Sequence, residues 1–261
     1  MTTANVNGIT IGYDDEGTGD DVLVLVHGHP FDRSMWRPQL EHFSAAGRRV
    51  IAADLRGYGE TTVVPGITPL DAFASDVAGL LDHLGVERFV LGGLSMGGQI
   101  VMECARTFPE RLRGLILADT FAQAETEDGR RNRNAMADRL LREGMSGYAT
   151  EVQWKMVAPH NPAVGEFVAG LMHNAPPEGA AAALRGRAER PDYTETLTSI
   201  TVPTLVIVGS DDEYTPVSDA EYMSERVPGS TLVVVDGAAH MPNLERPEVF
   251  NKAVERLLAQ T

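Results

Sequence analysis

The stretch that decides the fold of this chain is FVLGGLSMGG, residues 89–98. It starts as an apolar run typical of a buried strand, continues as G-x-S-x-G through Gly93, Ser95 and Gly97, and leads into a helical pattern of apolar residues. A serine on such a sharp strand-to-helix turn points its hydroxyl out of the sheet, and glycines are needed because side chains there would collide with adjacent backbone. The stretch therefore predicts Ser95 as a nucleophile, rather than as part of a plain glycine-rich turn.

Apolar runs elsewhere in the chain predict the rest of the sheet. They are rich in valine, isoleucine and leucine and have turn residues at their ends. Because the runs are continuous rather than alternating, they indicate strands buried on both faces and hence a mainly parallel sheet. Helical patterns lie between them, the clearest at residues 70–84 with Thr68 as its expected N-terminal cap, so we predict an α/β fold with helices on both sheet faces. The expected strands are residues 22–26, 50–53, 89–91, 115–118, 205–208 and 232–235.

Two regions depart from this alternation. Residues 6–13 form two short apolar runs around Asn7 and Gly8, which predicts an antiparallel hairpin at the edge of the sheet. From about Ala122 to Ile200 the chain offers helical pieces with no strand between them. We therefore expect an α/β core made of residues 1–121 and 201–261, with residues 122–200 inserted as a helical cap.

Composition and charge exclude several classes of protein. The 261 residues carry 22 Lys and Arg against 37 Asp and Glu, a net charge of −15, so binding to a nucleic-acid backbone would lack its main source of affinity. The single cysteine, Cys104, leaves no intramolecular disulfide, and no apolar run reaches the ~18 residues of a membrane span. The first residues show no signal-peptide pattern, so we expect a cytoplasmic protein with neither a nucleic-acid nor a membrane partner.

A serine nucleophile needs a base to remove its proton, and the chain has seven histidines to choose from. His240 follows the last predicted strand. Loops after parallel strands gather at one edge of the sheet, which is also where Ser95 is expected. His240 is therefore the predicted base.

The third member of such a site is a carboxylate that orients the imidazole. The loop after the strand at residues 205–208 holds three acids, of which only one can face His240. Asp119, directly after the strand at residues 115–118, is a separate alternative. The three acids of the loop are Asp211, Asp212 and Glu213.

Five short motifs carry a resemblance to a known family. They are HGHP at residues 27–30, DLRGYG at 54–59, GLSMGG at 93–98, GSDD at 209–212 and GAAH at 237–240. With them the chain resembles the α/β-hydrolase-fold serine esterases over essentially its whole length. It is most similar to small bacterial carboxylesterases, with further likeness to enol-lactonases and to cofactor-free haloperoxidases, or perhydrolases.

The resemblance implies roles for residues of these motifs. It puts the acid at the fourth position of GSDD, Asp212, and leaves Asp211 as a turn residue. It puts the oxyanion hole at the backbone N–H groups of His29 and Met96. The implied activity is hydrolysis of small or short-acyl carboxylic esters through an acyl-enzyme on Ser95.

Three other activities stay open on this reasoning. A lactonase would use the same residues on a cyclic ester, a perhydrolase would replace water with peroxide, and a receptor would keep the fold without turnover. No metal-ligand cluster, Walker lysine or dinucleotide fingerprint occurs, so we expect neither a metal nor a cofactor. The expected partner is a small-molecule ester, and the candidates for its pocket wall are Phe31, Trp154, Met156, Phe167, Leu171 and Met172.

Overall fold

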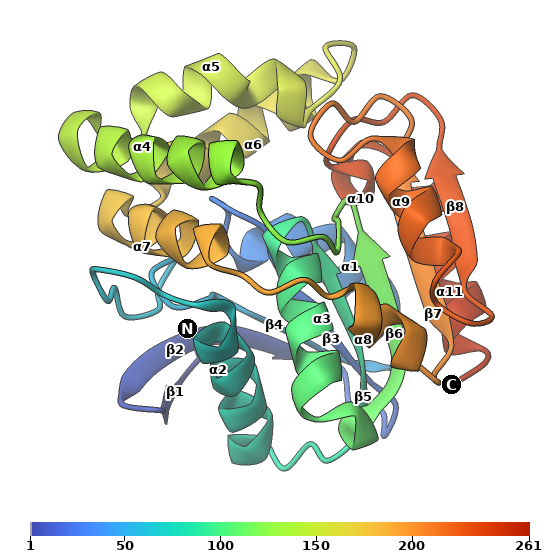
Figure 1. The fold of residues 1–261 in the computed structure, drawn as a ribbon. Coiled ribbons are helices and arrows are strands. Elements are labelled where there is room, and N and C mark those ends of the chain that lie inside the picture. Colours follow the sequence, from blue (N-terminus) through green and yellow to red (C-terminus); the bar gives the residue numbers. More distant parts are fainter. Residues whose placement is uncertain (1) are drawn as a thin grey trace.

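The predicted parallel sheet is present and has eight strands in the order β1-β2-β4-β3-β5-β6-β7-β8. The computed structural model describes residues 2–261 (Figure 1). β2 pairs antiparallel with both β1 and β4, and all other neighbouring strands are parallel. The prediction of an α/β fold with an antiparallel N-terminal edge is therefore confirmed. The strands are β1 Thr2–Val6, β2 Ile9–Glu16, β3 Val22–Val26, β4 Arg49–Ala53, β5 Phe89–Leu94, β6 Leu112–Ala118, β7 Thr204–Gly209 and β8 Thr231–Val235.

The edge hairpin forms because its turn residues tolerate an unusual backbone. Asn7 and Gly8 have φ angles of 51° and 78°. A two-residue hairpin turn of type I′ needs positive φ at both central positions, and Asn-Gly adopts this conformation readily. The turn sets the register in which Val6 pairs with Ile9.

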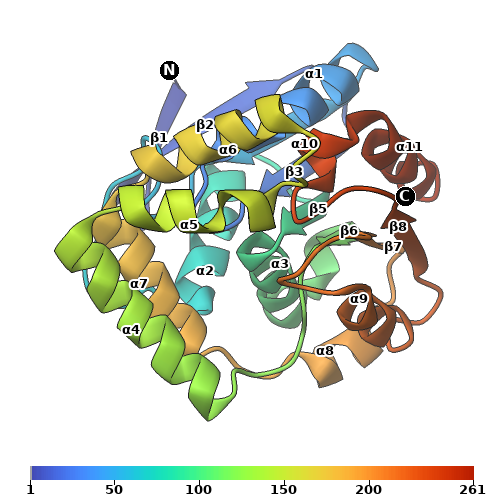
Figure 2. The same ribbon diagram turned by 90° about the horizontal axis from the view of Figure 1, so that it is seen from above.

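Helices cover both faces of the sheet (Figure 2). α1 and α11 pack together on one face, whereas α2, α3 and α8 lie on the other. None of the helices within residues 2–261 has the length and apolar character needed to cross a membrane. Outside the stretch between β6 and β7, the helices are α1 Arg37–Ala45, α2 Leu70–His83, α3 Met96–Thr107, α9 Val217–Ser224, α10 Pro242–Glu245 and α11 Pro247–Leu258, with 3₁₀ turns at Arg33–Trp36 and Pro109–Arg111.

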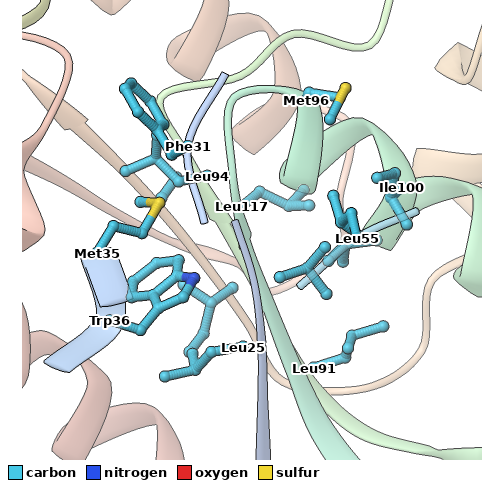
Figure 3. Packing of buried hydrophobic residues seen from close by; sticks show 14 of the residues in the cluster. Leu25, Phe31, Met35, Trp36, Leu55, Leu91, Leu94, Met96, Ile100 and Leu117 are labelled. Atoms are coloured by element: carbon cyan, nitrogen blue, oxygen red, sulfur yellow. The ribbon is translucent and has the colours of Figure 1, made fainter. Parts of the chain in front are cut away.

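The core lies between the sheet and these helices. In Figure 3, Met35 and Trp36 lie on one side of the central strands, and Leu55 and Ile100 lie on the other. Met35, Trp36 and Ile100 are fully buried. Apolar packing on both faces holds the central strands rigidly, so the loops at their carboxyl ends have a firm support.

Two local predictions are wrong. β8 is the last strand of the sheet rather than a strand buried on both faces, and Val234 is 43% exposed there. Thr68 does not cap α2, which begins without a side-chain cap. Instead, the Thr68 N–H donates to the Ala182 carbonyl oxygen at 3.0 Å, because a helix from the insertion packs against this loop.

Five helices intervene between β6 and β7, where the sequence shows no strand pattern. α4 packs against α7 and α5 packs against α6, and Figure 1 shows these four helices above the end of the sheet where β5 and β6 lead into their loops. α8 differs, because it returns to the side of the sheet and contacts α3. The five helices are α4 Glu127–Glu143, α5 Ser146–Met156, α6 Pro162–Asn174, α7 Pro177–Ala188 and α8 Thr194–Ser199.

Candidate active site

Ser95 lies on the turn between β5 and α3, in a backbone conformation that few residues adopt. Its φ and ψ are 58° and −115°. The turn is held on both sides, because the Ser95 N–H donates to the Ala118 carbonyl oxygen at 2.9 Å and Thr120 Oγ1 donates to the Ser95 carbonyl oxygen at 2.7 Å. A positive φ at a non-glycine residue is strained, and such strain is characteristic of functional positions.

The glycines of this turn are required by close backbone contacts. A Cβ on Gly93 would collide with the carbonyl group of Gly97, and a Cβ on Gly97 would collide with the carbonyl oxygen of Val26. β5, β3 and the start of α3 therefore approach each other more closely than side chains allow. This is the collision that G-x-S-x-G predicts.

His240 and Asp212 are joined by a buried hydrogen bond of 2.7 Å between His240 Nδ1 and Asp212 Oδ2. Asp212 also accepts hydrogen bonds from the backbone N–H groups of Tyr214 and Thr215, and from the Thr215 hydroxyl. Burial opposes ionisation of Asp212, but His240 and these donors outweigh it and lower its pKa. Asp211, in contrast, is exposed and accepts from the Ser210 hydroxyl within the turn.

Asp119 is buried next to this pair. Its Oδ1 accepts a hydrogen bond from the Gly209 N–H at 2.9 Å. Asp119, Asp212 and His240 each have one atom that could bind a metal ion, and these three atoms lie within 4.8 Å of one another. Burial, followed by the charge of Asp212, raises the pKa of Asp119 well above its ordinary value. Within residues 2–261 these three side chains are also the one set spaced for a metal ion. The raised pKa of Asp119 and the hydrogen bond between the other two side chains fit a hydrogen-bonded network better than an ion.

The loop that carries His240 is tied to the inserted helices. The His240 N–H donates to the Met156 carbonyl oxygen at the end of α5 at 3.1 Å. The buried carboxylate of Glu245 accepts from the N–H groups of Ala239 and Ala158, each at 2.9 Å. The position of the imidazole thus depends on α5 as well as on β8.

The sequence predicts an oxyanion hole at two backbone N–H groups, those of His29 and Met96. Within the described chain neither donates a hydrogen bond, and Met96 is the first residue of α3, where helical N–H groups lack partners. The loop before His29 runs beside Ser95, since a Cβ on Gly28 would lie 3.3 Å from the Cβ of Ser95.

His27 braces that loop. Its Nδ1 bonds to the Gly28 carbonyl oxygen at 2.9 Å, and its Nε2 accepts from the Leu55 N–H at 2.9 Å. In the adjacent DLRGYG turn, Asp54 accepts from the N–H groups of Arg33 and Glu60. Both side chains hold backbone in place.

A cavity of about 120 Å³ opens at Ser95 and His240. Besides these two, its wall contains apolar and aromatic side chains, a second histidine, two arginines and three neutral polar side chains, which come from α3 and from the loops after β6 and β7. The further lining residues are His29, Gln99, Thr120, Phe121, Arg133, Tyr148, Met156, Leu184, Arg187, Tyr214 and Thr215.

Of the six apolar residues predicted for the pocket wall, Met156 lines this cavity and the other five do not. Phe31 and Met172 are buried in the hydrophobic core, as is Leu171. Trp154 and Phe167 are 45% and 42% exposed. Apolar character alone does not predict which of these residues line the cavity, lie in the core or are exposed, because each face of an inserted helix has a different neighbour.

Sequence reasoning missed the polar part of the wall, above all Arg133 and Arg187. One signal was present in α7, where Arg185 and Arg187 are two residues apart. Side chains with that spacing point about 200° apart around a helix, so a helix with one exposed face must turn one of the two inward.

The remaining candidates lie away from the cavity. His42, His83, His160 and His173 are exposed. Cys104 is buried in α3, and burial raises the pKa of its thiol, which leaves it unreactive.

Comparisons with other proteins agree with the fold. The model of the alpha/beta hydrolase family matches residues 23–253. A thermophilic esterase from Thermogutta terrifontis, solved with malate bound, is 40% identical, with a TM-score of 0.95 and coverage of 100% of this chain and 99% of that one. The 3-oxoadipate enol-lactonase 2 of Acinetobacter baylyi is 30% identical over 98% of this chain and 96% of its own length. A non-heme chloroperoxidase of Kitasatospora aureofaciens is 30% identical over 90% of each protein.

The family match covers most of the chain, and its limits enclose the strands and loops that carry Ser95, Asp212 and His240. The order of the strands, the serine turn after β5 and the sequence match therefore lead to one conclusion: this chain belongs to the alpha/beta hydrolase family.

Proposed function

We propose that this protein is a carboxylic-ester hydrolase that works through an acyl-enzyme on Ser95. The observation that carries the proposal is the 2.7 Å hydrogen bond between His240 Nδ1 and Asp212, beside a cavity that Ser95 also lines. With a carboxylate on Nδ1, Nε2 is the nitrogen available to take the serine proton. The esterase and the lactonase among the relatives support the same class of reaction.

The first half-reaction transfers the acyl group to the enzyme. Ser95 Oγ attacks the carbonyl carbon of the ester while His240 Nε2 takes its proton. The N–H groups of His29 and Met96 stabilise the oxyanion, and Asp212 stabilises the imidazolium. The ester C–O bond then breaks, and His240 gives the proton to the departing alcohol.

The second half-reaction releases the acid. His240 takes a proton from a water molecule, which attacks the acyl carbon and forms a second oxyanion at the same two N–H groups. The bond to Ser95 Oγ breaks, and His240 returns the proton to the serine. One ester and one water have become one acid and one alcohol.

The insertion of residues 122–200 acts in this proposal as a cap on a core made of residues 1–121 and 201–261. In support, Tyr148 of α5 and Leu184 of α7 contribute to the cavity wall. The cavity volume of about 120 Å³ is well below the ~300–1,000 Å³ of sites for drug-sized ligands. A space of this size favours small or short-acyl esters.

A lactonase is the second candidate, because an enol-lactonase is among the relatives. The same residues would act, but the acid and the alcohol would remain one molecule after ring opening. The chloroperoxidase relative likewise favours testing peroxide in place of water. Rates on a linear short-acyl ester and on an enol-lactone, each with and without peroxide, separate the three reactions.

The proposal predicts that hydrolysis of p-nitrophenyl esters depends on Ser95. We expect Ser95→Ala to lower kcat/KM by about 10³-fold or more, because the nucleophile is lost while substrate binding remains. A p-nitrophenyl phosphonate inhibitor should phosphonylate wild-type Ser95 with loss of p-nitrophenol, so that mass spectrometry of peptides shows the added phosphonyl group; the variant should stay unlabelled.

Ser44→Ala, in α1 and outside the cavity, is the matched control and should keep wild-type activity. Equal activity of wild type and Ser95→Ala would refute the proposal. Absence of turnover on every ester and lactone tested would favour the receptor alternative.

A further inference from the structure

Arg187 is a buried arginine in the wall of the candidate active site. Its side chain comes from α7, is 6% exposed and lines the same cavity as Ser95 and His240. Its Nε donates to Gln99 Oε1 at 3.0 Å. Within residues 2–261 no carboxylate forms an ion pair with it.

An unpaired buried charge opposes folding, because the guanidinium loses its hydration without gaining a counter-charge. Burial, followed by the charges of Arg133 and Arg190, lowers the pKa of Arg187 well below its usual value. An arginine starts from so high a pKa that it stays protonated in proteins. A bound anion would supply the missing counter-charge and so offset the effect of burial and of the neighbouring arginines on this pKa.

The surroundings of Arg187 add positive charge. Arg133, which also lines the cavity, and Arg190 both pair with the single carboxylate of Glu125. Two guanidinium groups therefore share one acid, and Arg187 beside them has none. No Asp or Glu is among the cavity-lining residues of the described chain, although acids outnumber bases in the protein as a whole.

Two neutral groups of the wall also lack partners. His29 Nε2 and Gln99 Nε2 are buried, and within residues 2–261 neither has a hydrogen-bond partner. Both residues line the cavity beside Arg187. The Gln99 NH₂ group is always a donor, so it offers a hydrogen bond to the same anion that the guanidinium would attract.

The packing of α7 fixes the direction of Arg187. Cβ atoms on Gly179 and Gly186 would collide with the backbone of Gly57 and Thr68, respectively. These two glycines are seven residues apart, which puts them on one face of the helix. The helix cannot rotate without losing this contact, so Arg187 is held toward the cavity.

We propose that Arg187 binds a free carboxylate on the substrate, and thus that this protein hydrolyses esters or lactones that carry a second, ionised carboxyl group. The planar guanidinium has donors in a fork that matches a carboxylate, and charge-assisted bonds of this kind are stronger than neutral ones. The proposal rests on the ester hydrolase activity proposed above and names its substrate class.

The test compares acids with their neutral amides as substrates. Monoethyl succinate carries the free carboxylate on its acyl part, and acetoxyacetic acid carries it on its alcohol part. The matching neutral compounds are ethyl succinamate and acetoxyacetamide, and a pH-stat follows hydrolysis of all four. We expect wild type to prefer the acid in at least one series by about tenfold or more in kcat/KM.

Variants assign the preference to Arg187. In Arg187→Met the ratio of kcat/KM for acid over amide should fall to about one, and Arg187→Lys should recover part of it because charge returns without the fork. Arg185→Met is the matched control: it removes an arginine from the same helix, but one that pairs with Asp138 outside the cavity. Its ratio should equal that of wild type.

A binding measurement keeps the test independent of turnover and of the folding of the variants. Succinate should bind to wild type in calorimetry and compete with a neutral ester, whereas succinamide should do neither. Hydrolysis of neutral esters that depends on Ser95, without preference for acids in either series and without succinate binding, would overturn the role of Arg187 alone. Succinate binding without hydrolysis of any ester would instead overturn the proposed hydrolase activity.

Discussion

Two buried carboxyl groups beside His240 have pKa values that are shifted in opposite directions, because their surroundings differ. Asp212 receives hydrogen bonds from two backbone N–H groups, the Thr215 hydroxyl and His240, which lower its pKa despite burial. Asp119 receives one, from the Gly209 N–H, and its pKa is raised. Burial and then the charge of Asp212 disfavour ionisation of Asp119, whereas the donors around Asp212 favour its ionised form.

This difference predicts how Asp119→Asn changes the pH dependence of stability. Because its pKa is raised, Asp119 in the folded protein holds a proton that the unfolded chain has lost. Asp119 therefore lowers the free energy of unfolding as pH rises above the ordinary pKa of about 4. This loss of stability continues until the pH passes the pKa of Asp119 in the folded protein. Asn cannot ionise, so the variant should gain stability relative to wild type as pH rises. Urea unfolding from about pH 5 to about pH 8 measures it.

Asp211→Asn is the control for this measurement, because Asp211 is exposed in the same loop. Its stability should follow the wild-type pH profile. If the profiles of Asp119→Asn and wild type are parallel over the whole range, Asp119 is ionised in the folded protein and the interpretation of the pair is wrong.

At the scale of elements, the position of α7 connects the inserted helices to the core. Gly179 packs against Gly57 of the DLRGYG turn, and Gly186 packs against Thr68 before α2. Thr68 also donates its N–H to Ala182 of α7, where Thr68 was expected to cap α2. The contact with α7 thus uses the backbone that precedes α2.

Gly186→Ala should therefore destabilise the protein, although alanine is the better helix former. Its Cβ would collide with the Thr68 carbonyl oxygen, which is backbone and cannot move aside as a side chain would. We expect a loss of about 1–3 kcal/mol in the free energy of unfolding, measured by urea denaturation.

Gly170→Ala, in α6, is the matched control. A Cβ there meets no atom within 4 Å in the described structure, so the gain in helix propensity should raise stability by about 0.5–1 kcal/mol. Equal effects of the two substitutions would mean that α7 is not locked against the loop.

At the scale of the whole molecule, the sign of the charge differs between the protein and its cavity. The chain has a net charge of −15, whereas Arg133 and Arg187 line a cavity without acids among the described residues. An anionic substrate would be repelled at long range by the net negative charge of the protein and attracted by the two arginines once inside the cavity. Salt screens the two effects unequally, because exposed charges are screened far more than buried ones.

Raising the ionic strength should therefore favour the acid over its amide. Between about 10 mM and about 150 mM salt the screening length falls from about 30 Å to about 8 Å. We expect kcat/KM for the preferred acid to rise by on the order of twofold to tenfold relative to that for the neutral amide. A ratio that falls with salt would mean that exposed positive charge, rather than Arg187, attracts the acid.

The strands and the serine turn could be predicted because both depend on neighbouring residues. A continuous apolar run is readable wherever it occurs, and G-x-S-x-G sits between a strand and a helix in the printed sequence as it does in the fold. His240 followed from the parallel topology, which brings the carboxyl ends of the strands together. The choice of Asp212 among the nearby acids needed the family resemblance, because three acids in one loop have the same local pattern.

The polar wall of the cavity, the exposure of β8 and the role of Thr68 could not be predicted in this way. Each depends on which element lies next to another: β8 is an edge because no strand follows it in the sheet, and Arg187 faces the cavity because two glycines hold α7 against the core. Local patterns specify which segments form helices and strands. Which way a helical side chain points in the folded protein depends on how the helix is rotated against its neighbours. That rotation is set by packing contacts between residues far apart in the chain.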